Sequence, residues 1–166
     1  MKMKFNLRRI FALPAAGLML AALLSQAADI SKQPARPSPD WLRNGVIYEI
    51  FPRDFSAAGN LNAVTAKLDQ IKDLGVTVLW IMPIHPIGEK GRKGDFGSPY
   101  SIQDYYAVDP NYGTLDDFKN LVTQAHKRGL KVIMDLVANH TSWDSVMMTN
   151  KDFYKQDALG NIISPQ

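Results

Sequence analysis

Cysteine is absent from the 166-residue sequence, which excludes disulfides, cysteine-ligated metals and a lipid anchor on an N-terminal cysteine. The sequence also lacks a histidine and carboxylate cluster with metal-ligand spacing, a phosphate-binding loop and a serine nucleophile elbow. The segment GEKGRKGDFG has glycines and positive charge, but it does not run directly from a strand into a helix. We therefore expect it to be a flexible loop.

Long apolar runs are confined to the N-terminus. Residues 1–27 begin with the cationic stretch MKMKFNLRR, continue with the apolar stretch IFALPAAGLMLAALL and end in small residues, as secretory signal peptides do. A membrane anchor is the alternative, but the apolar run is shorter than the roughly 20 residues of a spanning helix, and Pro14 interrupts it. We expect a periplasmic or extracellular protein with no membrane contact after signal cleavage.

The excess of positive charge belongs to the same N-terminal segment. Four of the 19 lysines and arginines, and none of the 16 aspartates and glutamates, lie in residues 1–27. The rest of the chain therefore has one more acidic than basic residue. The basic pI comes from the targeting segment, so nucleic acid is not an expected partner.

Strand and helix patterns alternate after a predicted linker over residues 28–40, which holds three prolines and few large apolar side chains. Short apolar runs predict strands over 45–51, 76–82 and 130–137, and amphipathic runs predict helices over 60–75 and 114–129. Asn60 is a candidate N-cap and Gly75 a C-terminal stop, while Thr114 and Asp117 fit a capping box. This alternation predicts an α/β fold with a parallel sheet.

Residues 83–113 form a long predicted loop rich in glycine, proline and tyrosine. Loops of this length are uncommon and usually functional. Tyr100, Tyr105 and Tyr106 either pack beneath the loop or offer stacking platforms for sugar rings, and the sequence pattern does not choose between these roles. His85 follows the second strand between two prolines, where packing and ligand binding both stay open.

Polar residues interrupt the apolar run at the third strand, in the stretch KVIMDLVANHTSWD. In parallel α/β folds, ligands bind beyond the carboxyl ends of the strands, where Asn139 and His140 are expected. Asp135 falls inside the predicted strand and needs a cationic or donor partner, because an unpaired buried carboxylate costs several kcal/mol. Turn formation and N-glycosylation are alternative roles for Asn139, and a plain polar role is an alternative for His140. His126 lies near a predicted helix C-terminus, which favours a role in complementing the helix dipole or in packing over a role in ligand binding.

Four segments in the same order resemble the α-amylase family of glycoside hydrolases, between about Trp41 and Trp143. They are IYEIFPRDFS, GVTVLWIMP, SPYSIQDYYAVDPNYGTLDDFKNLV and DLVANH. The resemblance implies a partial TIM (β/α)8 barrel over residues 41–166, made of about three β/α units and the start of a domain inserted after the third strand. It also implies a retaining hydrolase of starch and maltooligosaccharides, with α-glucans as partners.

The resemblance also implies roles for individual residues. Asp135 matches an aspartate that orients an arginine near the family's nucleophile. Asn139 matches a position that binds a structural calcium ion. His140 matches a histidine that donates a hydrogen bond to the sugar beside the scissile bond, and Tyr100 matches an aromatic residue that stacks on that sugar.

The catalytic carboxylates of the family follow its fourth, fifth and seventh strands, and no residue of this sequence matches them. We therefore expect an N-terminal fragment of a secreted enzyme, inactive alone. Two other hypotheses stay open: a sugar-binding α/β module without catalysis, and a compact doubly wound domain unrelated to glycosidases.

Overall fold

The computed structural model describes residues 30–164, which belong to two compact units divided after Ser38. In the first unit, Ile30–Lys32 form a short 3-10 helix (η1), and irregular chain follows where the linker is predicted. The predicted signal peptide over residues 1–27 lies outside the described residues. Among residues 30–164, no helix combines the length and apolar character needed to cross a membrane.

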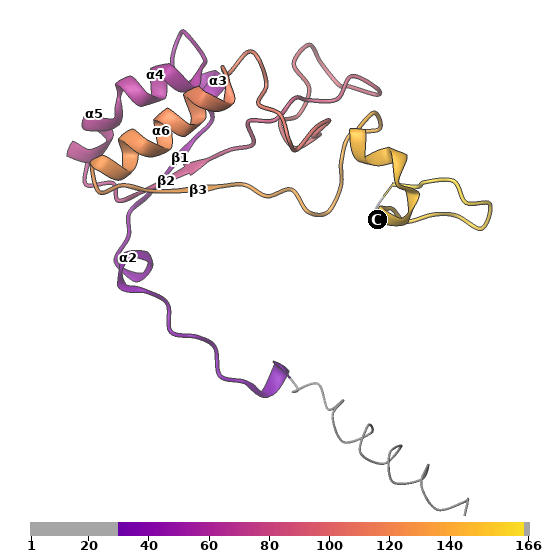
Figure 1. Ribbon diagram of the computed structural model, residues 1–166, viewed down its shortest axis with the longest axis horizontal. Coiled ribbons are helices and arrows are strands. Elements are labelled where there is room, and N and C mark those ends of the chain that lie inside the picture. Colours follow the sequence, from indigo (N-terminus) through magenta and orange to yellow (C-terminus); the bar gives the residue numbers. More distant parts are fainter. Residues whose placement is uncertain (1–29, 165–166) are drawn as a thin grey trace, which may run out of the picture. The chain divides into compact units, whose positions relative to one another are not determined.

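Three short strands form one parallel sheet in the second unit (Figure 1). They are β1 (Ile47–Ile50), β2 (Val78–Ile81) and β3 (Lys131–Met134), and β2 lies between the other two. Ile47 is the register partner of Val78, which is in turn the partner of Lys131. The predicted parallel order is confirmed, although each strand is shorter than its apolar run.

Helices cover one face of this sheet (Figure 1). The three main helices are α4 (Leu61–Ala66), α5 (Leu68–Asp73) and α6 (Leu115–Lys127), and the shorter α2 (Asp40–Arg43) and α3 (Pro52–Phe55) flank β1. The single helix predicted over 60–75 is wrong in its continuity, because Lys67 adopts φ −104° and ψ 4° between α4 and α5. The Thr65 hydroxyl donates to the Leu61 carbonyl at 3.0 Å, just before this break.

The predicted helix caps are present. The Asn60 side chain accepts a hydrogen bond from the Ala63 amide at 2.9 Å at the start of α4. Thr114 and Asp117 form a capping box at the start of α6, and hydrogen bonds from Thr114 lower the pKa of Asp117. Gly75 has φ 84° and ends α5 in the left-handed conformation that suits glycine.

The core lies between the sheet and the helices. All four apolar residues predicted to share a helical face are at most 4% exposed: Leu61, Val64, Leu68 and Ile71. They pack with Leu79 and Ile81 of β2 and with Leu121 and Ala125 of α6. Burial of these side chains is the main favourable term for folding, at roughly 1.5–3 kcal/mol for each large apolar side chain.

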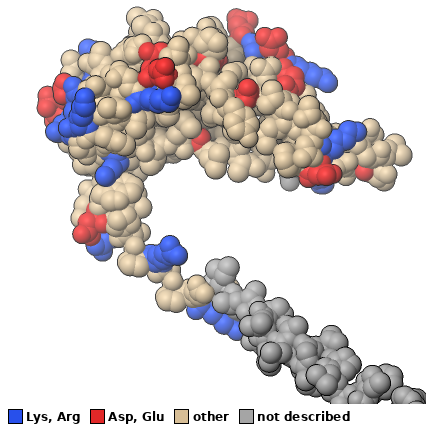
Figure 2. Space-filling view, viewed as in Figure 1, with Lys and Arg blue, Asp and Glu red and all other residues tan. Residues whose placement is uncertain are grey.

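The other face of the sheet is open among the described residues. Glu49, Trp80 and Ile133 are register partners, and the alternation along β2 places them on the side away from Leu79 and Ile81. Ile133 is 37% exposed. Figure 2 shows charged side chains mainly over the helices and loops, while the surface along β3 is mostly uncharged. This face therefore places the exposed, charged Glu49 beside the half-buried Trp80 and the partly exposed Ile133.

The chain after β3 differs from the predicted strand over 130–137. β3 ends at Met134, so that Asp135 follows the strand instead of lying within it. Residues 135–145 are irregular, and two 3-10 helices follow: η2 (Val146–Thr149) and η3 (Lys151–Phe153). β3 ends together with β2, whose last residue, Ile81, is the register partner of Met134.

Replacing the fully buried Leu121 by Ala should destabilise the second unit by about 2–5 kcal/mol, because the lost side chain leaves a cavity. Leu115→Ala in the same helix is the matched control, since Leu115 is 52% exposed. Urea denaturation followed by circular dichroism should show a large drop in midpoint for the first variant alone. Equal midpoints would contradict the assignment of this core.

Candidate functional site

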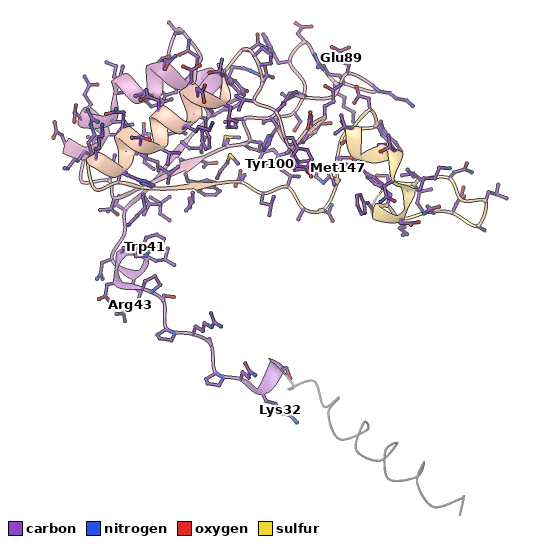
Figure 3. The ribbon with its side chains drawn as sticks, viewed as in Figure 1. Lys32, Trp41, Arg43, Glu89, Tyr100 and Met147 are labelled. Atoms are coloured by element: carbon purple, nitrogen blue, oxygen red, sulfur yellow. The ribbon has the colours of Figure 1, made fainter. Side chains whose placement is uncertain are left out.

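The carboxyl ends of the three strands share one edge of the sheet because the strands are parallel. The long loop, residues 83–113, leaves β2 at this edge, and residues 135–164 leave β3 there. In Figure 3, Tyr100 lies on the side of the sheet from which the chain continues toward Met147. This edge is where a parallel α/β fold places its ligands.

Asp135 joins the sheet to the long loop through both of its carboxylate oxygens. Its Oδ1 accepts a hydrogen bond from the Trp80 indole Nε1 at 2.7 Å, and its Oδ2 accepts one from the Tyr100 hydroxyl at 2.8 Å. The partner that sequence analysis could not identify is therefore a pair of neutral donors. The carboxylate is half-buried rather than fully buried, which lowers the cost of keeping it charged.

The hydrogen bond with Asp135 also changes the acidity of Tyr100. It raises the pKa of the Tyr100 hydroxyl above its usual value, with smaller contributions from burial and from the negative charge of Asp135. Because the folded-state pKa is raised, this bond stabilises the fold below the ordinary tyrosine pKa and is lost as pH rises through the raised value. The predicted stacking of Tyr100 on a sugar stays a prediction.

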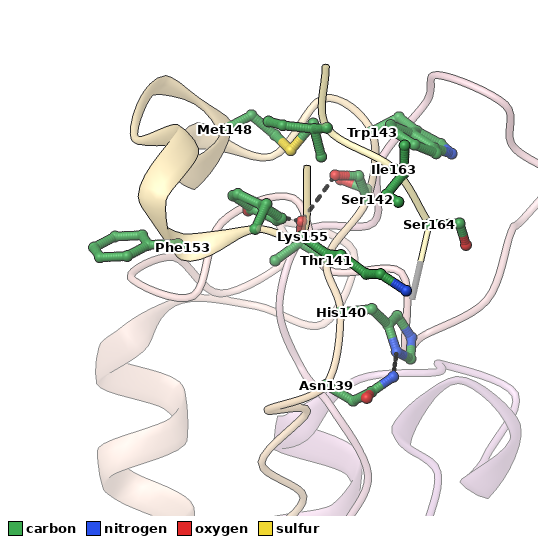
Figure 4. Close-up of a pocket in the computed structure, with 12 residues that line it drawn as sticks. Asn139, His140, Thr141, Ser142, Trp143, Met148, Phe153, Lys155, Ile163 and Ser164 are labelled. Carbon is green, nitrogen blue, oxygen red and sulfur yellow. Dashed lines mark hydrogen bonds between the residues drawn. The ribbon is translucent and has the colours of Figure 1, made fainter. Parts of the chain in front are cut away.

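Asn139 and His140 lie side by side and exposed beyond β3. The Asn139 Nδ2 and the His140 Nδ1 are 3.2 Å apart and hydrogen bonded (Figure 4). Both residues line two neighbouring cavities of about 400 and 360 Å³, together with Phe153 and Tyr154. The structure thus brings two of the predicted site residues to a hollow with aromatic walls, which is a suitable surface for a sugar ring.

The two remaining histidines lie apart from this hollow. His85 places its Nδ1 2.9 Å from the Ala107 carbonyl oxygen, and its ring centroid is 5.5 Å from that of Tyr105. These contacts favour the packing role for His85 over a ligand role. His126 is exposed in the last turn of α6, where a basic side chain complements the helix dipole.

Asp144 ties the long loop to the chain that follows the Asn139 and His140 pair. Its Oδ2 accepts hydrogen bonds from the amides of Glu89 and Lys90 at 2.8 and 3.2 Å and from the Gln103 Nε2 at 3.2 Å. Gly88 packs so closely here that a Cβ atom would collide with Ser142 and Asp144. We call this arrangement of residues 88–90, Gln103 and Asp144 the Asp144 clamp.

The clamp is strongest when Asp144 is ionised. Burial by itself would raise the pKa of Asp144, but the donors around the carboxylate, first among them the Glu89 amide, lower it from 3.8 to about 2. Because the folded-state pKa is lowered, the clamp stabilises the loop fully above about pH 4 and is lost as pH falls through about 2.

The described residues do not form a complete metal site. Within residues 30–164, no three histidine, aspartate or glutamate side chains group closely enough to hold a metal ion. Asn139 offers one amide oxygen, whereas calcium takes about six to eight oxygen ligands. The described residues around Asn139 therefore do not fit a calcium site by themselves.

Sequence reasoning missed the residues that hold the site together. The alternation of β2 could have indicated the role of Trp80 as a donor to Asp135, because every second residue of a strand faces away from the helices. The role of Asp144 has no such signal, since its partners lie more than forty residues earlier along the chain, in an irregular loop.

Known proteins resemble the part of the chain that forms the sheet and this edge. A family model described as the alpha amylase catalytic domain matches residues 40–159. Trehalose-6-phosphate hydrolase of Bacillus subtilis (strain 168) is 42% identical over 130 residues, which are 75% of this chain and 21% of that protein. Alpha-amylase 3 of Dictyoglomus thermophilum is 43% identical over 108 residues, covering 61% and 20%. The chain spans about a fifth of the length of these curated relatives.

Solved structures agree with this match. An alpha-amylase from Lactobacillus plantarum is similar with a TM-score of 0.71 and 52% identity, over 74% of this chain and 29% of that one. A maltogenic alpha-amylase from Thermotoga neapolitana gives a TM-score of 0.69 and 40% identity, over 72% and 29%. The predicted fold class is confirmed: the sheet and its helices form part of a (β/α)8 barrel.

Replacing Asp144 by Ala should release the long loop, which contains three trypsin sites at Lys90, Arg92 and Lys93. We expect trypsin near neutral pH to cleave these sites several-fold faster than in the wild-type chain, because local opening governs cleavage. Asp152→Ala is the control, since Asp152 is an exposed acid on η3 that carries the same charge. Unchanged cleavage in the Asp144 variant would show that the clamp does not hold the loop.

Proposed function

The chain belongs to the alpha-amylase family, and from this membership we propose that it forms part of a glycoside hydrolase acting on α-glucans such as starch and maltooligosaccharides. The observation that carries the proposal is the arrangement at the strand ends. Tyr100 is bonded to Asp135, and His140 lines an aromatic hollow, all within the residues that match the family's catalytic domain.

In this proposal, His140 and Tyr100 contact the sugar in different ways. His140 is exposed at the hollow, so its imidazole can exchange water for a sugar hydroxyl as a hydrogen-bond partner. The Tyr100 hydroxyl is already bonded to Asp135, so its contact with a sugar would be through the ring face. A ring held at its hydroxyl loses little further freedom when a sugar stacks on it.

Asp135 is a support residue rather than the nucleophile. A retaining glycosidase needs one carboxylate that attacks the anomeric carbon and a second that serves as acid and base. Both Asp135 oxygens accept hydrogen bonds, from Trp80 and Tyr100, which lowers the nucleophilicity of the carboxylate. We propose that the described residues bind and orient the sugar, and that this chain alone does not cleave it.

Two further features of the proposal, a targeting segment and a calcium ligand, rest on the sequence pattern and the family resemblance. We propose that residues 1–27 direct the enzyme to the periplasm or the exterior, because their cationic start and apolar core suit the secretion machinery. We also propose that Asn139 contributes one ligand to a structural calcium ion, with the other ligands supplied elsewhere in the enzyme.

The relatives separate this proposal from the other hypotheses. A doubly wound domain unrelated to glycosidases is wrong, since residues 40–159 match the family model. The relatives include proteins named as hydrolases, glucosidases and amylases, which favours a hydrolase over a sugar-binding module without catalysis.

A chimeric enzyme tests the proposal. Residues 40–159 replace the corresponding segment of the Lactobacillus plantarum amylase, to which the chain is 52% identical, and release of reducing sugar from maltooligosaccharides is measured. We expect the chimera to hydrolyse them, and His140→Ala to lower kcat/KM by about 10- to 100-fold through loss of hydrogen bonds to the sugar.

The matched control is His126→Ala in the same chimera, because His126 is exposed on α6 away from the strand ends. It should leave kcat/KM within about twofold of the parent chimera, as surface substitutions usually do. A folded chimera without activity would overturn the proposed function, and equal effects of the two substitutions would overturn the role of His140.

A further inference from the structure

We propose that the Tyr105 hydroxyl is the group that positions residues 136–140, the segment that carries Asn139 and His140. This inference rests on the proposed function in one respect, namely that His140 contacts the sugar. The positioning itself follows from the contacts of the segment and can be tested without any sugar.

The segment has little else to hold it. After the Asp135 amide donates to the Ile81 carbonyl at 3.1 Å, the chain leaves the sheet and forms no regular structure before η2. Leu136 is 80% exposed, and Asn139 and His140 are exposed as well. Within residues 30–164, only the Tyr105 hydroxyl forms a hydrogen bond from elsewhere in the chain to the backbone of residues 136–140.

The hydroxyl contacts two backbone carbonyls of this segment. It donates to the Val137 carbonyl oxygen and also lies 3.1 Å from the His140 carbonyl oxygen. A hydroxyl has one proton, so the two carbonyls share it. The Tyr105 oxygen thus holds the carbonyl groups of Val137 and His140 near each other. Burial raises the pKa of Tyr105, with a further contribution from Tyr154, so the hydroxyl keeps its proton at neutral pH.

The Tyr105 ring is itself held from the side of the long loop. Its centroid is 5.5 Å from that of His85, at an interplanar angle of 48°. His85 is in turn bonded to the Ala107 carbonyl, two residues beyond Tyr105. The tyrosine therefore spans from the loop after β2 to the segment after β3, and it lines the same hollow as His140.

The chain offers a matched pair of variants. Tyr105→Phe removes the hydroxyl and keeps the ring against His85, so we expect the fold to be retained. Tyr106→Phe removes the same atom from the neighbouring residue, which is 89% exposed. Backbone amide order parameters of the full chain, measured by ¹⁵N relaxation, report the motion of residues 136–140 directly, and those of α6 check the fold.

We expect order parameters of about 0.85 over residues 136–140 in the wild-type chain and in Tyr106→Phe, and below about 0.6 in Tyr105→Phe. In the chimera, Tyr105→Phe should also lower kcat/KM by about 5- to 10-fold, the effect of one lost hydrogen bond. Unchanged order parameters in Tyr105→Phe would overturn the inference, whatever the activity. Lower order parameters in Tyr105→Phe, found together with an inactive chimera, would support the positioning and count against the proposed function alone.

Discussion

The carboxylate of Asp135 is the group on which the arrangement of the strand ends depends. One oxygen is bonded to Trp80 in β2, and the other is bonded to Tyr100 in the long loop. The carboxylate thus connects β2 and β3 to the loop, because β3 leads directly into it. Two neutral donors suffice here since the carboxylate is half-buried and still partly solvated.

Two other links complete the site at a distance from Asp135. The Asp144 clamp holds residues 88–90 and Gln103 of the long loop, and the Tyr105 hydroxyl holds the segment with Asn139 and His140. Each link joins the loop after β2 to the chain after β3. The candidate sugar-contacting residues therefore depend on the contact between these two irregular segments more than on the sheet itself, and such segments are the most mobile parts of a fold.

Much of the fold could be predicted from the sequence because its signals are local. The apolar run of β2, the capping box at Thr114 and the stop at Gly75 each act within a few residues. The break at Lys67 could not be predicted, because the apolar spacing on both sides of it fits one continuous helix. The position of Asp135 beyond β3 was missed for a related reason: strand length is set by pairing with β2, which the apolar pattern of β3 does not contain.

The site was predicted through its residue types and not through its contacts. The family resemblance named Tyr100, Asp135, Asn139 and His140, but the donors and clamps around them join residues 32 to 55 positions apart. The pKa of Tyr100, measured by NMR titration in the wild-type chain and in Asp135→Asn, tests the central interaction most directly. We expect a raised pKa in the wild-type chain and a lower one in the variant, which loses the negative charge. An identical pKa in both proteins would contradict it.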